Sequence, residues 1–148
     1  MAGGKFRAAQ QLYFRGKQFL ACAAWLDGAN EGDGYVVRHQ LSQGLELVLK
    51  ALLLNKDYDK YEPMLHKPFG HDLEKLAAEV CSVYGHALRP KLATDLMRLN
   101  AFFKKHHFRY AHELESVFYP AEAFPIKQLS IRLLAVLNLA DKVFIPPK

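Results

Sequence analysis

The chain has 148 residues, of which 51% are hydrophobic and 24% are charged. These proportions are typical of a globular protein with a substantial core, and they exclude an intrinsically disordered chain. Lys and Arg number 20 against 15 for Asp and Glu, so the formal net charge is +5, which favours anionic partners such as RNA, nucleotides or acidic proteins.

Apolar residues recur at spacings of three and four in five segments, which predicts helices, and we find no convincing strand alternation. The predicted helices cover approximately residues 6–26, 35–55, 73–84, 90–110 and 126–144. Asp72 suits the N-cap of the third helix, Gly85 suits its C-terminal end, and Pro90 suits the first turn of the fourth. Residues 56–70 are expected to be irregular. Together these features predict an all-α protein, an antiparallel up-and-down bundle of four to five helices.

The predicted second helix is apolar around much of its circumference but carries one polar ridge. The ridge consists of His39, Gln43, Glu46 and Lys50, which follow one another at spacings of four, three and four. Such a ridge is either a solvated face, with a Glu46–Lys50 ion pair that contributes a few tenths of a kcal/mol, or the lining of a ligand-binding cleft.

A basic cluster ends the predicted fourth helix. Its members are Lys104, Lys105, His106, His107, Arg109 and His112. Arg keeps its charge while His titrates near neutral pH, so this cluster can hold a phosphate or transfer a proton. The candidate ligand-binding residues are therefore His39, Glu46, Lys50, Lys104, Lys105, His106 and His107, and the candidate catalytic pair is Arg109 and His112.

Metal and cofactor signatures are not apparent in the sequence. The His-rich cluster contains neither a His-Glu-x-x-His segment nor a Cys pair, and His107 and His112 are five positions apart, which is awkward for two ligands from one helix. There is no Gly-x-Gly-x-x-Gly segment, no Walker loop and no local signature of a Ser or Cys triad. We expect no metal and no cofactor.

The cysteines and the N-terminus indicate a cytoplasmic protein. Cys22 and Cys81 lie within apolar helical patterns without Cys-x-x-Cys spacing, which predicts buried free thiols in a reducing compartment. Basic residues interrupt the N-terminal segment, so no signal peptide is apparent, and no apolar run has the length of a membrane span. We expect a single cytoplasmic domain over residues 1–148.

Four segments carry a resemblance to a known family. Residues 8–26 combine small and aromatic side chains, residues 46–53 read Glu-x-x-x-Lys-Ala-Leu-Leu, residues 70–73 contain His-Asp-Leu, and residues 108–110 read Phe-Arg-Tyr. In this order, which spans about residues 8–112, they resemble the HEPN (higher eukaryotes and prokaryotes nucleotide-binding) superfamily. The last segment is similar to the Arg-Tyr-Pro ending of many relatives.

The resemblance implies a helical bundle, often a homodimer, that acts on RNA or binds nucleotides. Many relatives are metal-independent endoribonucleases whose Arg is followed by a His after four to six residues; here Arg109 and His112 have two residues between them, and Ala111 replaces the frequent proline. Arg109 could hold the scissile phosphate while His112 transfers a proton. Alternatively, Arg109 pairs with Glu113 or Glu46, and His112 is simply exposed.

Three functions are compatible with these patterns. The first is binding of RNA or a nucleotide through a basic cleft, as a homodimer. The second is an interaction subunit for a nucleotidyltransferase or an antitoxin, with the aromatic residues Phe118, Tyr119 and Phe124 as a contact patch. The third, placed below the others because the Arg–His spacing differs from the family signature, is a toxin-like, metal-independent endoribonuclease. Whether the protein is an enzyme stays open.

Overall fold

The structure is a computed structural model that describes residues 2–28, 34–86, 89–103, 136–145 and 147. Over these residues the chain is an all-α bundle, as predicted. Its helices are α1 (Ala2–Gly28), α2 (Gly34–Lys56), α3 (Tyr58–Tyr61), α4 (Leu73–Tyr84) and α5 (Pro90–Phe103). Residues 136–144 are also helical and are called the C-terminal helix below.

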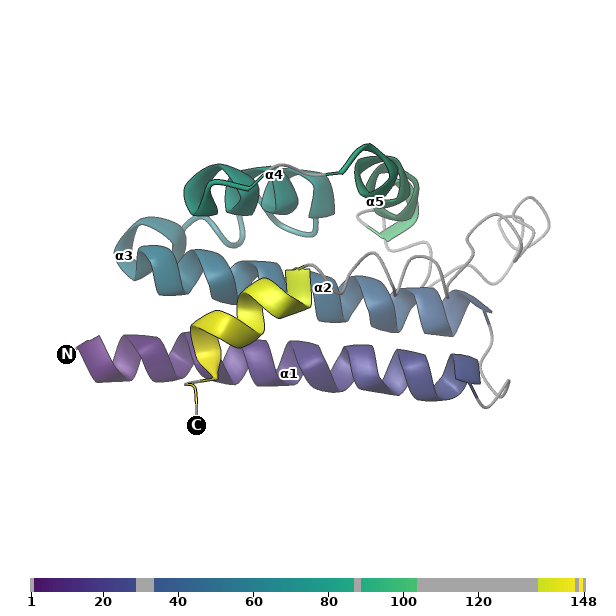
Figure 1. The fold of residues 1–148 in the computed structure, drawn as a ribbon. Coiled ribbons are helices and arrows are strands. Elements are labelled where there is room, and N and C mark those ends of the chain that lie inside the picture. The colour runs from purple at the N-terminus through teal and green to yellow at the C-terminus, as the bar shows by residue number, and fades with distance from the viewer. Residues whose placement is uncertain (1, 29–33, 87–88, 104–135, 146, 148) are drawn as a thin grey trace.

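The arrangement is built around α2. Figure 1 shows α1 and α2 side by side and running in opposite directions, with α4 on the other side of α2 and α5 viewed nearly along its axis. α2 contacts α1, α3, α4 and α5. α2 is therefore the central helix of the described bundle, which fits its apolar character around much of its circumference.

α1 and α2 approach closely at two facing glycines. A Cβ atom placed on Gly16 would lie 2.8 Å from the carbonyl oxygen of Gly44 and 2.8 Å from Cγ2 of Val48. A Cβ atom on Gly44 would lie 2.8 Å from the carbonyl oxygen of Gly16 and 2.7 Å from Cγ of Leu20. Both positions therefore require glycine, because any side chain would push the two backbones apart.

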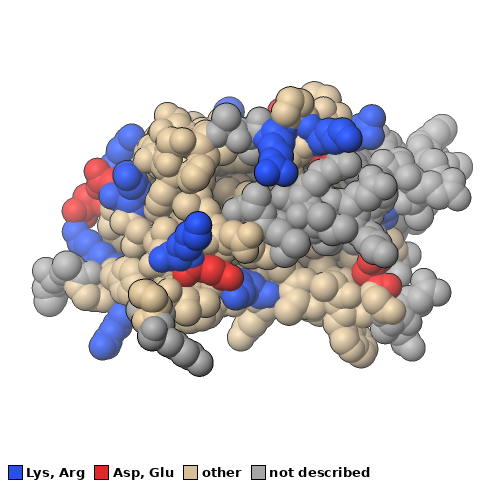
Figure 2. Space-filling model, viewed as in Figure 1, with Lys and Arg blue, Asp and Glu red and all other residues tan. Residues whose placement is uncertain are grey.

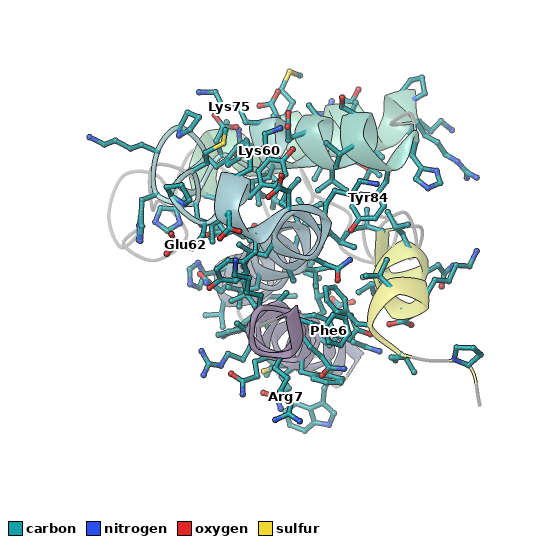
Figure 3. The ribbon with its side chains drawn as sticks, turned by 90° about the vertical axis from the view of Figure 1, so that its left-hand side faces the viewer. Phe6, Arg7, Lys60, Glu62, Lys75 and Tyr84 are labelled. Atoms are coloured by element: carbon teal, nitrogen blue, oxygen red, sulfur yellow. The ribbon has the colours of Figure 1, made fainter. Side chains whose placement is uncertain are left out.

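The core follows the predicted apolar stripes. On α2 the buried stripe comprises Leu41, Leu45, Val48, Leu49, Leu52 and Leu53, on α4 it comprises Leu73, Leu76, Ala77 and Val80, and on α5 it comprises Leu92, Leu96, Leu99 and Phe103. Each large side chain removed from water contributes about 1.5–3 kcal/mol. α4 is further tied to α2 because the Tyr84 hydroxyl donates to the carbonyl oxygen of Leu52 at 2.8 Å (Figure 3).

Local signals at the ends of α4 and α5 behave as predicted. The Asp72 side chain accepts a hydrogen bond from the backbone N–H of Lys75, which caps the N-terminus of α4. Gly85 ends this helix with a φ of 68°, in the left-handed region that glycine adopts without strain. Pro90 is the first residue of α5.

The segment expected to be irregular contains one short helix, α3, so this part of the prediction was wrong. Its N-cap is Asp57, whose side chain accepts a hydrogen bond from the Lys60 N–H at 3.1 Å. Tyr61 is buried, and its hydroxyl donates to Glu79 of α4 at 2.6 Å. This single helical turn is therefore held by a cap and by a contact with α4. Neither contact leaves a periodic pattern of apolar residues in the sequence, so the pattern did not predict the helix.

The C-terminal helix packs on α1 through a small polar and aromatic cluster. The ring of Phe144 stacks on the ring of Tyr13, with centroids 4.8 Å apart. The Tyr13 hydroxyl donates to Asp141, and Lys17 Nζ donates to the same carboxylate at 3.1 Å. Figure 2 shows acidic and basic side chains side by side where this helix crosses α1. The predicted last helix is thus confirmed over residues 136–144.

The two cysteines are free thiols, but they are not equally buried. Cys81 is half-buried, and burial raises the pKa of its thiol. Cys22 is exposed, so the prediction of a buried thiol was wrong at this position. The reason is that residues 19–26 are apolar on every side of α1, and periodicity could not indicate which side faces α2.

Candidate functional site

The polar ridge of α2 is centred on a buried carboxylate. Glu46 retains 3% of its surface exposed. Lys50 Nζ donates to Glu46 Oε1 at 2.6 Å, and Nδ1 of His71 lies 3.0 Å from Glu46 Oε2. Each oxygen of the carboxylate thus has its own partner, which offsets the cost of removing this charge from water.

The predicted Glu46–Lys50 pair is therefore present, but it does not lie on a solvated face. The Lys50 side chain retains only 12% exposure, and His39 and Gln43 are half-buried. Glu46 is two residues beyond Gly44, or about 200° around the helix, so it points away from α1. The ridge consequently faces the side of α2 on which α4 and α5 lie.

His71 connects the buried carboxylate to the surface. A carboxylate only accepts hydrogen bonds, so Nδ1 of His71 carries the proton and donates a hydrogen bond to Glu46. This contact fixes the tautomer and the orientation of the imidazole ring. The His71 side chain retains 42% exposure, so a ligand in solution can reach a histidine that a buried acid holds in place.

The end of α5 lies at the same corner. The ring of Phe103 is 5.8 Å from the ring of His39 and 5.9 Å, edge-on, from the ring of His71. Phe103 is buried and is the last residue of α5. In the sequence, the predicted basic cluster begins at the next residue, Lys104.

A buried amide holds the start of α4 in place beside His71. Asn100 of α5 accepts a hydrogen bond from the Leu73 N–H at 2.8 Å, and its Nδ2 donates to Asp72 Oδ1 and Glu74 Oε1, both at 3.0 Å. Asn100 retains only 2% exposure. His71 precedes Asp72 directly, so the contacts of Asn100 determine where the His71 backbone lies.

α2 carries two further buried polar residues that continue the line of Glu46 and Lys50. Arg38 retains 4% exposure and Ser42 none. With Glu46 and Lys50 they follow a strict spacing of four, whereas the predicted ridge contained His39 and Gln43 at the positions before Glu46. The buried polar line of the helix therefore shares Glu46 and Lys50 with the ridge that the sequence suggested and differs from it by one residue at the first two positions.

Of the predicted site residues, the structure brings together the three on α2. Glu46 contacts both Lys50 and His71, and the rings of His39 and His71 both lie beside the ring of Phe103, so the three residues share one corner. The remaining candidates lie outside the described residues: Lys104, Lys105, His106, His107, Arg109 and His112, together with Glu113 and the aromatic residues Phe118, Tyr119 and Phe124. Their roles stay predictions from the sequence.

Sequence reasoning did not assign a functional role to His71 or Asn100. His71 entered only as part of the His-Asp-Leu resemblance, and Asn100 was not singled out. A signal for His71 existed, because a histidine directly before an N-cap must lie at a helix end, where side chains often reach a neighbouring element. Its partner Glu46 is 25 residues away, a separation that no local pattern reports.

In the part of the chain that the structure describes, no three His, Cys, Asp or Glu side chains gather closely enough to hold a metal ion. In the same part, no helix combines the length and the apolar character needed to cross a bilayer.

Comparisons with family models, with curated proteins and with solved structures give no match to this chain. The functional interpretation therefore depends on the residues and their contacts.

Proposed function

We propose that the protein is a HEPN-like binding module that holds a phosphate group of RNA or of a nucleotide at the Glu46 corner, formed by His39, Glu46, Lys50 and His71. The observation that supports this proposal most strongly is the contact between the buried Glu46 carboxylate and the exposed His71 ring. A histidine oriented in this way holds its Nε2 in a fixed position, and when the ring carries a second proton this nitrogen donates to phosphate oxygens, which are strong acceptors.

The charges of the corner are compatible with an anionic ligand. The negative charge of Glu46 is already balanced by Lys50 at 2.6 Å, so an approaching phosphate meets a neutral pair and two histidines instead of a bare carboxylate. The chain as a whole carries a formal charge of +5, which attracts polyanions. In the proposal, the basic cluster that follows Phe103 in the sequence supplies further cations.

The test is a binding titration with a fluorescent single-stranded RNA and, separately, with ATP. Affinity should fall steeply between about 50 mM and about 200 mM salt, because each neutralised phosphate releases a counterion. His71→Ala should weaken binding about tenfold or more, equivalent to about 1.4 kcal/mol or more. His86→Ala is the matched control, since His86 is exposed beyond the opposite end of α4.

No affinity for either ligand at low salt would refute the proposal. An equal loss of affinity in the His71 and His86 variants would refute the assignment of the site. The homodimer that the resemblance implies is checked separately by sedimentation velocity, over a concentration range that spans the binding experiment.

A second candidate function is a metal-independent endoribonuclease. The observation that favours it is the Glu46–His71 contact. A carboxylate that orients an imidazole is an arrangement used for general acid–base catalysis. Purified protein should then cut single-stranded RNA in excess chelator and leave cyclic phosphate ends. Separate His71→Ala and His112→Ala variants distinguish the histidine of the corner from the one predicted, with Arg109, from the sequence.

A further inference from the structure

The side of α1 that faces away from α2 is exposed and carries an unusual combination of side chains. Gly16 marks the line of contact with α2. Arg7 and Trp25 each lie nine positions from Gly16, about two and a half turns, so both face the opposite direction. Figure 3 shows Arg7 on the side of α1 remote from α2. Trp25 is 66% exposed and Phe14 is 45% exposed.

The cations of α1 divide into two pairs. Lys5 binds Asp59 at 2.6 Å and Lys17 binds Asp141 at 3.1 Å, so both are neutralised within the chain. Arg7 and Arg15 are exposed and form no ion pair with the described residues. The acidic residue of α1, Asp27, lies at the far end of the helix. Within the described part of the chain, the two guanidinium groups therefore have no carboxylate partner, and a partner molecule can supply one.

Apolar groups lie beside these arginines. Phe14 lies between Arg7 and Arg15 in the sequence, and the exposed residues Ala21, Cys22 and Trp25 continue the same side of α1 toward its C-terminus. Together, Arg7, Phe14, Arg15, Cys22 and Trp25 are called the outer face of α1. Gln11 and Gln18 are also exposed on this side, the first between Arg7 and Phe14 and the second between Phe14 and Trp25. Exposed apolar side chains interleaved with polar and charged ones are typical of an interaction surface.

We propose that the outer face of α1 binds an acidic amphipathic helix of another protein. α1 is 27 residues long, or about 40 Å, and a second helix can lie along its whole length with apolar residues against Phe14 and Trp25. Carboxylates of that helix pair with Arg7 and Arg15, whose forked guanidinium groups suit them.

A second copy of this chain is a poorer occupant. A two-fold axis near the middle of α1 would place Arg15 close to its own symmetry mate, and no carboxylate of the face lies near enough to compensate. RNA could supply phosphates to the arginines and stack bases on Phe14 and Trp25, but Ala21 and Cys22, which are exposed between the two rings, offer no strong donor to a nucleotide. These small side chains gain stability only by burial against apolar groups.

Trp25 provides a direct readout because it is the one tryptophan of the chain. The probe is a tryptophan-free synthetic helix of about three heptads, with Leu at the a and d positions and Glu at the flanking positions. Titration with this peptide should shift the Trp25 emission to shorter wavelength and reach saturation. The same peptide with Lys in place of Glu should cause no saturable shift.

Charge-reversal variants test the arginines. Arg7→Glu with Arg15→Glu should weaken peptide binding about tenfold or more, because each pairing becomes a repulsion. Arg89→Glu with Lys91→Glu is the matched control, since both residues are exposed at the start of α5 and the change in net charge is the same. Thermal unfolding of both double variants checks that the fold is retained.

Three results would overturn the proposal. The first is an equal shift of Trp25 emission with the acidic and the basic peptide, or no shift with either peptide. The second is a shift of Trp25 emission on concentrating the protein alone, which identifies a second copy as the occupant. The third is an arginine-dependent shift with oligouridine, which identifies a nucleic-acid surface. His71→Ala should leave peptide binding unchanged, so this proposal is tested independently of the Glu46 corner.

Discussion

The Glu46 carboxylate, buried in the middle of α2, accepts a hydrogen bond from Nδ1 of His71, which lies just before the start of α4. This contact joins two helices through one charged group, and Lys50 completes it from the same helix as Glu46. A buried acid in this arrangement both stabilises the fold and orients an exposed histidine. The two roles can be separated by substitution.

Removal of Glu46 should destabilise the protein far more than removal of a surface acid. In Glu46→Ala, Lys50 loses its counterion while its side chain is only 12% exposed, and the expected cost is about 3–5 kcal/mol. Urea unfolding measures this cost. The double variant Glu46→Leu, Lys50→Met should recover most of it, because no unpaired charge is left. A loss below about 1 kcal/mol in Glu46→Ala would mean that this pair behaves like a surface one.

The close contact of α1 with α2 predicts opposite effects of the same substitution at two glycines. Gly16→Ala should cost about 1–3 kcal/mol, because the new Cβ atom would lie 2.8 Å from a backbone oxygen of α2. Gly4→Ala should instead stabilise by about 0.5–1 kcal/mol, since nothing lies within 4 Å of a Cβ atom there and alanine favours the helix. Thermal and urea unfolding of both variants test the pair. If Gly16→Ala were neutral, the two helices would not pack as closely as described.

The docking of the C-terminal helix should depend on acid pH through Asp141. Partial desolvation would raise the pKa of this carboxyl group, but hydrogen bonds from Tyr13 and Lys17 outweigh it and lower the pKa below the ordinary value. A carboxyl with a lowered pKa in the folded state contributes stability above its ordinary pKa of about 4. This contribution is lost as the pH falls through the lower, folded value.

Asp141→Asn should therefore be less stable than the wild type near neutral pH, and the difference should shrink below about pH 4. Unfolding midpoints measured from neutral to strongly acid pH give both curves. Asp27→Asn is the control, because Asp27 is exposed at the end of α1, ten residues beyond Lys17; it should follow the wild-type curve. A constant difference between wild type and Asp141→Asn across this range would contradict the assigned contact.

The fold was predictable where its signals are local. The bounds of α4 agree with the prediction because Asp72 caps one end and Gly85 adopts a positive φ at the other. The apolar stripe of α2 was also predictable, since it faces neighbours along its whole length. The inner face of α1 was less clear: Tyr13 and Leu20 are buried there, but apolar residues continue around the helix.

The site was predictable only in part, for a related reason. Glu46 and Lys50 are four residues apart on one helix, and this spacing alone predicts a contact. His71 and Asn100 act on residues that are 25 to 28 positions away, so their roles follow from how α2, α4 and α5 pack and not from any period. Whether a charged residue on an apolar helix is buried or solvated also depends on that packing.

Asn100 is expected to act as a positioning residue for the Glu46 corner. In Asn100→Ala, the buried Leu73 N–H loses its acceptor, at a cost of about 1–3 kcal/mol, and the start of α4 is no longer held to α5. The Leu73 amide should then exchange with solvent faster than it does in the wild type, while amides in the middle of α2 are less affected. Native-state hydrogen exchange measures both. Asn138→Ala is the matched control, since Asn138 is exposed on the C-terminal helix. Unchanged protection of Leu73 in Asn100→Ala would show that the cap formed by Asp72 positions α4 without help from α5.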